Sequence, residues 1–442
     1  MPATDARKKL ILVVIDGLTP SMLESTLEGP TAPALSLLAE HGRYGRAVST
    51  FPSLTPVCLS SLATGAHPDV HEIPHLVWYH RDERRLVEYG SSFGAVRAAG
   101  TRRSLIDTIY GLNASHLGRR AVTVYEALED AGLTAAAVNI TCYRGRHAHA
   151  PTVPFLTRPA YGPSRFFFYN LFRSDVTGAP LSVRSRPRGT IDAYAAAVGR
   201  WLVTRDGFDF LVFYLSDYDY ASHAQGPDAA HATLARCDEA VGTLIAAAGG
   251  PDEFLERYAV VLCADHGQTA VREVAQLGEA FPDAIVTASN RAGMVYASGD
   301  AGELAARLDG NPAVDVVLRR EGEEAVARRD GAELRFTPSG TSGDASILDH
   351  PEGRGRAWAA LANPNAGELI VSAAAGWEFA DLAGRHHAGG GSHGSLLTGD
   401  SEVPMLTVGL ERQPGSIVDV MPAVLDHFGV AAPEYARAPA RV

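Results

Sequence analysis

The residues of this sequence best suited to chemistry are aspartates and histidines that follow apolar runs or lie in glycine-rich loops. Asp265 and His266 come directly after an apolar run and just before Gly267, which eases a turn. Mixed carboxylate and imidazole ligation without thiolates suits Zn²⁺ best, and Mn²⁺ is the alternative. Three carboxylates, three imidazoles and a hydroxyl suit two closely spaced divalent metals and a nucleophile, so the sequence predicts a metallohydrolase. The full set of candidates is Asp16, Thr55, Asp219, His223, Asp265, His266 and His393.

Two candidates lie in the N-terminal part of the chain. Asp16 follows the apolar run Leu10–Ile15, where a buried carboxylate needs a cation, a hydrogen-bond network or a helix terminus to compensate it. A turn or capping role is equally open for this residue. Thr55-Pro56 opens a predicted helix at Val57–Ala63, with threonine at the cap and proline at the first helical position. The positive helix end would favour an alkoxide and a bound phosphate oxygen, and the alternative is a plain N-cap.

The remaining candidates follow later apolar runs. Asp219 and His223 are four residues apart and can reach one ion if the turn is helical, with Asp217 as the rival ligand. Carboxylates this close at a strand end would repel each other without a nearby cation. His393 lies in a segment with four glycines, 388–394, which permits close approach of the backbone to a ligand.

Length and composition limit the classes of protein to consider. The chain has 442 residues, is 46% apolar and carries a formal charge of −12. This charge argues against duplex nucleic acid and anionic membranes as partners. The apolar run at 10–15 is too short to span a bilayer, and no signal-peptide pattern follows it. The four cysteines have no CxxC spacing, which indicates reduced core thiols, and we expect a cytoplasmic protein.

The order of apolar and helical segments predicts an α/β fold with a mostly parallel sheet covered by helices on both faces. Strands are expected at 10–15, 135–140, 208–215, 258–264, 369–373 and 403–408, and helices near 33–41, 122–131, 192–203, 229–247 and 417–428. A core domain is expected over 8–274, a smaller inserted α+β subdomain over 275–375, and a return to the core over 376–435. Functional residues should collect at the carboxyl ends of the strands.

Two further segments could contact a substrate. Residues 151–181 contain the run Phe166-Phe167-Phe168-Tyr169 and predict either a packed surface loop, which we favour, or a lid over an apolar part of the substrate. Arg144 and Arg146 could grip an anionic group, although a solvated basic loop is the favoured alternative.

The ordered set Asp, Thr, Asp-x-x-x-His, Asp-His-Gly and Gly-x-His-Gly resembles the alkaline phosphatase superfamily. It is most similar to the type I phosphodiesterase/nucleotide pyrophosphatase branch, and phosphonoacetate hydrolase looks similar too. The resemblance covers about 10–404. It implies one zinc site at Asp16, Thr55, Asp265 and His266, another at Asp219, His223 and His393, and Thr55 as a nucleophile that becomes phosphorylated.

The resemblance also has an ambiguity and a departure. Thr50-Phe51-Pro52 copies a tripeptide found around the nucleophile in that branch, but the family's spacing before the pair Thr64-Gly65 selects Thr55. The family has an asparagine that holds a phosphate oxygen after a His-Gly-Ile turn. The matching stretch, 71–76, has no asparagine, and His75 is the candidate to replace it.

The sequence therefore predicts a two-metal hydrolase that cleaves phosphodiester or pyrophosphate bonds of a small phosphorylated substrate through a phospho-threonine intermediate. A phosphomonoesterase and a phosphonate C–P hydrolase are the alternatives, followed by a metal-bound binding protein with degenerate catalysis. A sulfatase is disfavoured because 58–62 lacks Cys-x-Pro-x-Arg, and a cofactor-independent phosphoglycerate mutase would use serine.

Overall fold

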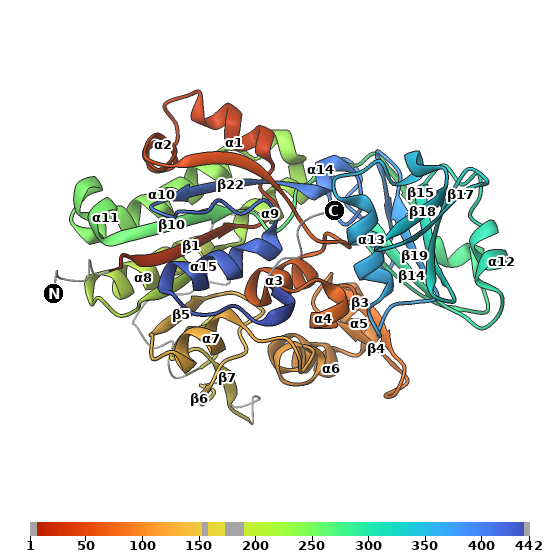
Figure 1. Ribbon diagram of the computed structural model, residues 1–442, viewed down its shortest axis with the longest axis horizontal. Helices are drawn as coiled ribbons and strands as arrows, with labels where there is room; N and C mark the ends of the chain where they lie inside the picture. Colours follow the sequence, from red (N-terminus) through yellow and green to blue (C-terminus); the bar gives the residue numbers. More distant parts are fainter. Residues whose placement is uncertain (1–6, 153–157, 173–189, 437–442) are drawn as a thin grey trace.

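A seven-stranded sheet forms the centre of the larger part of the molecule, seen on the left in Figure 1. The structure is a computed structural model and describes residues 7–152, 158–172 and 190–436. Of the seven strands, β22 alone runs opposite to the others, so the sheet is mostly parallel as predicted. In spatial order the strands are β2 (Arg43–Val48), β22 (Glu402–Val408), β10 (Tyr258–Cys263), β1 (Lys9–Ile15), β9 (Phe210–Leu215), β5 (Ala135–Val138) and β8 (Arg165–Phe167).

Helices cover both faces of this sheet, which explains why its central strands are continuous apolar runs. Helices α2 (Pro33–Glu40), α8 (Thr190–Thr204), α10 (His231–Ala248) and α11 (Pro251–Arg257) form one packed group. Helices α3 (Thr55–Thr64), α7 (Val124–Asp130) and α15 (Val420–Phe428) form another. Helices α1 (Pro20–Leu27) and α2 both contact strand β22.

A second sheet of seven strands, entirely antiparallel, lies at the opposite end of the molecule (Figure 1). Side chains alternate between its two faces, so one face packs on α13 (Gly353–Leu361) and the other on α12 (Ala301–Ala306). Its strands in spatial order are β13 (Ile285–Ser289), β14 (Ala292–Tyr296), β19 (Leu369–Ala373), β15 (Val314–Glu321), β16 (Glu324–Arg329), β17 (Ala332–Thr337) and β18 (Gly340–Gly343).

Strand β19 corrects one sequence expectation. The apolar run at 369–373 does form a strand, but it pairs with β14 and β15 in the antiparallel sheet and takes no part in the parallel one. A short apolar run indicates burial without specifying the sheet that it joins.

The aromatic segment is part of the hydrophobic core. β8 adds to the edge of the parallel sheet, and the side chains of Phe166, Phe167 and Phe168 are all buried. These three residues therefore form neither a surface loop nor a lid, while 153–157 and 173–181 of the predicted insertion lie outside the described residues. All four cysteines are buried and free. Among the described helices, none has both the length and the hydropathy needed to cross a bilayer.

Short elements connect these layers and complete the chain. They include α9 (Asp217–Gln225), β3 (Val77–His80), β4 (Arg85–Glu88), α5 (Phe93–Ala99), β20 (Trp377–Phe379) and β21 (Gly391–Ser392).

Candidate active site

Three aspartates meet at the carboxyl edge of the parallel sheet. β1 lies between β10 and β9, with Val14 opposite Cys263 and Ile15 opposite Leu215. Asp16 therefore emerges beside Asp265 on one side, and α9, which carries Asp219, begins just after β9 on the other. This is the edge at which open α/β sheets hold their ligands.

Helix α9 presents Asp219 and His223 on one face because the two residues are one turn apart. Their Oδ2 and Nε2 atoms are 3.3 Å apart. The rival residue, Asp217, instead accepts a hydrogen bond of 3.1 Å from the backbone of Asp192 and does not line the cavity.

Thr55 is partly exposed at the first residue of α3, and its cap position is taken by Leu54, one residue earlier than expected. Its Oγ1 lies 3.1 Å from His266 Nε2. Thr50 is fully buried and does not line the cavity, so the two candidate hydroxyls have different environments.

The three histidines share one hydrogen-bonding arrangement. Each Nδ1 contacts a backbone carbonyl: His223 at Gly391 (2.7 Å), His266 at Gly267 (3.0 Å) and His393 at Ser53 (2.7 Å). Because a carbonyl can only accept, each Nδ1 must donate, and the Nε2 atoms of the neutral rings carry lone pairs. Histidines that ligate metals are oriented by this kind of contact.

The Nε2 lone pairs face carboxylate oxygens. His266 Nε2 is 3.3 Å from Asp16 Oδ1 and 3.5 Å from Asp265 Oδ2. His393 Nε2 is 3.9 Å from Asp219 Oδ1. Ligand atoms gather within 4.8 Å of one another in two buried groups, Asp16 with Asp265 and His266, and Asp219 with His266 and His393.

These two groups contain carboxylate oxygens without hydrogen-bond partners, which a bound cation would satisfy. Asp16 Oδ1 and Asp265 Oδ2 are buried and accept no hydrogen bond from the described residues. A lone pair facing a carboxylate oxygen is repulsive unless a proton or a metal ion lies between them. The donor set therefore fits divalent metals, with His266 shared by both groups in the observed geometry and His223 beside Asp219.

Burial and like charges perturb the pKa values of these groups. Burial, reinforced by the charges of Asp265 and Asp219, raises the pKa of Asp16 well above its usual range. Burial also raises the pKa of Asp265 and, together with His266, lowers the pKa of His393. Burial would raise the pKa of Asp219, but the positive charge of a protonated His223 ring outweighs it and lowers that pKa, and Asp219 in turn raises the pKa of His223. A bound cation would stabilise all of these groups in the forms that ligate metals.

The outer oxygens of the carboxylates are held by residues that sequence reasoning missed. Tyr214 donates its hydroxyl to Asp16 Oδ2, and the Gln268 amide donates to Asp219 Oδ1. Asp265 Oδ1 accepts from the backbone of Gly17 (3.2 Å) and of His266 (3.0 Å). Both had positional signals: Tyr214 is near the end of β9, five residues before Asp219, and Gln268 directly follows Asp-His-Gly.

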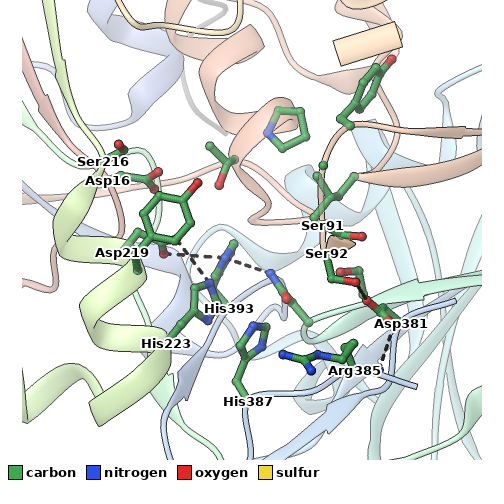
Figure 2. A pocket seen from close by; sticks show the side chains of 18 of the residues that line it. Asp16, Ser91, Ser92, Ser216, Asp219, His223, Asp381, Arg385, His387 and His393 are labelled. Atoms are coloured by element: carbon green, nitrogen blue, oxygen red, sulfur yellow. Dashed lines mark hydrogen bonds and ion pairs between the residues drawn. The ribbon is translucent and has the colours of Figure 1, made fainter. Parts of the chain in front are cut away.

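A cavity of about 620 Å³ opens beside these residues. Figure 2 shows Asp16, Asp219, His223 and His393 on one wall and Ser91, Ser92, Asp381 and Arg385 on the facing wall. Aromatic side chains also line it, among them the exposed Phe93 and Tyr220.

Asn290 is a further lining residue without a sequence signal. It lies in the turn between β13 and β14, and its Nδ2 is 3.0 Å from His393 Nε2. Because that nitrogen must accept, the Asn290 amide donates to it.

Three predicted substrate contacts do not reach the cavity. His75 is fully buried, with Nε2 at the carbonyl of Ala292 (3.2 Å) and Nδ1 accepting from Val77 (3.0 Å). Arg144 pairs with Glu126 and donates to backbone carbonyls, and Arg146 pairs with Glu126 and Asp130. None of the three lines the cavity, because each is already satisfied by internal partners.

Comparison with known proteins identifies the family. Residues 10–396 match the type I phosphodiesterase/nucleotide pyrophosphatase family. The chain therefore belongs to this family, within the alkaline phosphatase superfamily, and is an enzyme of its phosphoester-cleaving class. No curated protein sequence matches the chain.

Solved structures of two kinds share the fold. Murine ectonucleotide pyrophosphatase/phosphodiesterase 5 has a TM-score of 0.63 at 15% identity, with 96% of each chain covered. Phosphonoacetate hydrolase from Sinorhizobium meliloti 1021, solved with phosphonoformate, has a TM-score of 0.64 at 20% identity, with 95% of this chain and 96% of that chain covered. The murine protein has also been solved with AMP, and the bacterial hydrolase with phosphonoacetate.

Proposed function

We propose that the protein is a two-metal phosphoester hydrolase in which Thr55 is the nucleophile. The observation that carries the proposal is the position of His266 Nε2, which faces the unpartnered carboxylate oxygens of Asp16 and Asp265 and lies 3.1 Å from Thr55 Oγ1. Zinc is the favoured metal because the ligands are imidazoles and carboxylates. One ion is assigned to Asp16, Thr55, Asp265 and His266, and the other to Asp219, His223 and His393.

The protein residues then have separate tasks. Bound at these ligands, divalent metals would lower the pKa of the Thr55 hydroxyl and offset negative charge on the phosphoryl group. Thr55 Oγ1 forms a bond to phosphorus as the bond to the leaving oxygen breaks. Water then forms a new bond to phosphorus as the bond to Thr55 breaks. The N-terminus of α3 favours negative charge at the point where Thr55 acts.

Asn290 supplies the amide donor that 71–76 lacks. Its Nδ2 hydrogen bond to His393 Nε2 uses the lone pair that a metal would take, so metal binding frees this donor for a phosphoryl oxygen. Because Asn290 is buried in the wall of the cavity, the orientation of its side-chain amide is restricted.

The preferred substrate is a small phosphodiester or pyrophosphate, in keeping with the family to which the chain belongs. A phosphonate C–P bond is the second candidate, because the fold is shared with phosphonoacetate hydrolase. Parallel assays with a diester, a monoester and phosphonoacetate would separate these reactions. The cytoplasmic location stays a prediction from the sequence.

The test of the proposal combines metal analysis with turnover. Purified protein should contain two equivalents of metal and hydrolyse a para-nitrophenyl diester. Thr55→Ala should keep most of the metal and lose turnover, whereas Ser21→Ala, at a hydroxyl outside the cavity, should keep both. Full activity in Thr55→Ala, or a metal-free active protein, would refute the proposal.

A further inference from the structure

We infer that the substrate carries a second anionic group, a carboxylate or a phosphoryl group, which binds Arg385 on the wall facing the proposed metal ligands. This inference rests on the proposed function and specifies its substrate. Of the described residues that line the cavity, Arg385 is the sole lysine or arginine.

The guanidinium of Arg385 has no partner among the residues that the structure describes. It makes no hydrogen bond or ion pair to the described residues, although several other arginines are held by carboxylates, such as Arg291 by Asp400 at 2.8 Å. Figure 2 shows the Arg385 side chain extending from its loop toward His387 and the metal-ligand wall. An unpaired cation directed into a cavity is a ready partner for an anion, because its fork of donors matches carboxylate and phosphoryl oxygens.

The loop that carries Arg385 is fixed by Asp381. Asp381 Oδ1 accepts hydrogen bonds from the backbone of Ala383 and of Arg385, each 2.8 Å. Asp381 Oδ2 accepts from the Ser92 hydroxyl, which ties this loop to the start of α5. These donors satisfy the Asp381 carboxylate, so it leaves the guanidinium of Arg385 available to a ligand.

The same loop reaches the proposed metal ligands. The His387 ring stacks on His223 with centroids 4.0 Å apart, and its Nδ1 contacts the buried Glu378 at 3.1 Å. Two residues of chain span at most about 7 Å, so the backbone of Arg385 is close to this stacked pair. The second anion would thus be separated from the reacting phosphorus by a small group.

Three esters with the same para-nitrophenyl leaving group test this inference. The second ester group is carboxymethyl, phosphonomethyl or the neutral carbamoylmethyl, which is close to carboxymethyl in size. The wild-type protein should have a kcat/KM at least about tenfold higher for one or both anionic esters than for the neutral one, as expected for a charge-assisted contact. Arg385→Gln should remove this preference and leave the kcat/KM of the neutral ester within about twofold. The anionic ester with the higher kcat/KM shows whether the second anionic group of the substrate is a carboxylate or a phosphoryl group.

Arg412→Gln is the matched control, since Arg412 is exposed and does not line the cavity. Equal kcat/KM values for all three esters in the wild type would overturn the inference and leave the proposed hydrolase intact. A preference that persists in Arg385→Gln would also overturn it. Absence of turnover with all three esters, under conditions in which metal is bound, would overturn the proposed function and this inference together.

Discussion

Replacing Gly17 with alanine should displace Asp219 and impair catalysis far more than it impairs folding. Gly17 follows Asp16 and has φ of +69°, in the left-handed region. A Cβ atom added there would lie 2.8 Å from Asp219 Oδ1 and 2.9 Å from Gln268 Nε2. These two groups hydrogen-bond to each other, so the new methyl would push on the pair that positions a proposed metal ligand.

The size of the effect can be worked out from this geometry. A left-handed alanine costs about 1 to 2 kcal/mol of folding free energy. A comfortable carbon–oxygen contact is near 3.4 Å, so Asp219 must move by about half an ångström. A misplacement of about 1 Å can reduce a rate by about a hundredfold, so we expect kcat/KM to fall by about tenfold or more.

Gly310→Ala is the matched control. Gly310 has φ of +71°, but nothing lies within 4 Å of its added Cβ. The backbone strain is common to both variants, whereas the collision occurs in Gly17→Ala alone. Melting temperature, metal content and kcat/KM toward a diester would be measured for both variants.

Both variants should lose stability, Gly17→Ala at least as much as Gly310→Ala, but activity and metal binding should fall in Gly17→Ala alone. Activity in Gly17→Ala equal to that of Gly310→Ala would refute the assigned role of Asp219 at this close approach.

Three further predictions concern individual buried groups. Asp265→Asn should make the chelator-treated protein melt higher than chelator-treated wild type, because it removes one of several buried like charges; a lower melting temperature would contradict the electrostatic account. Burial lowers the pKa of His75 to about 4 from 6.5, so the stability due to its neutral ring is present above pH 6.5 and is lost as the pH falls. The wild-type protein should therefore lose about 2 kcal/mol of unfolding free energy through this residue when the pH falls to 5, and His75→Asn should not show that part of the loss. Urea unfolding at several pH values would measure it. The same pH dependence in both proteins would contradict the role given to His75. Asn290→Ala should lower kcat/KM by about tenfold to a hundredfold with metal content unchanged, and wild-type kinetics would exclude its contact with the phosphoryl group.

The strands of the parallel sheet could be predicted from the sequence because a local apolar run marks each of its central strands. Continuous apolar runs at β1, β9 and β10 predict strands buried on both faces, and parallel strands bring their carboxyl ends to one edge. The convergence of Asp16, Asp219 and Asp265 follows from this register. Tyr214 and Gln268 lie near the ends of the same strands, Tyr214 on β9 and Gln268 just after Asp265-His266-Gly267. Each holds a carboxylate from a distant part of the chain, Asp16 and Asp219, so the pairing itself follows from the sheet order.

Asn290 and the wall facing the metal ligands could not be predicted, because tertiary packing places them. Asn290 comes from a turn of the second sheet, and Arg385 from a loop held by Asp381 and Ser92. Arg144 and Arg146 lie away from the cavity for the complementary reason. Their partners Glu126 and Asp130 lie on α7, 16 to 20 residues away in the chain, and sequence alone does not pair them.

The central claim is that Thr55 forms a covalent bond to phosphorus. The direct measurement is acid quenching of the metal-loaded protein during turnover of a diester, followed by peptide mass mapping. The account predicts a phosphoryl adduct on Thr55 that appears with substrate and disappears when substrate is exhausted. An adduct on another residue, or rapid turnover with no adduct together with inversion of configuration at phosphorus, would contradict it.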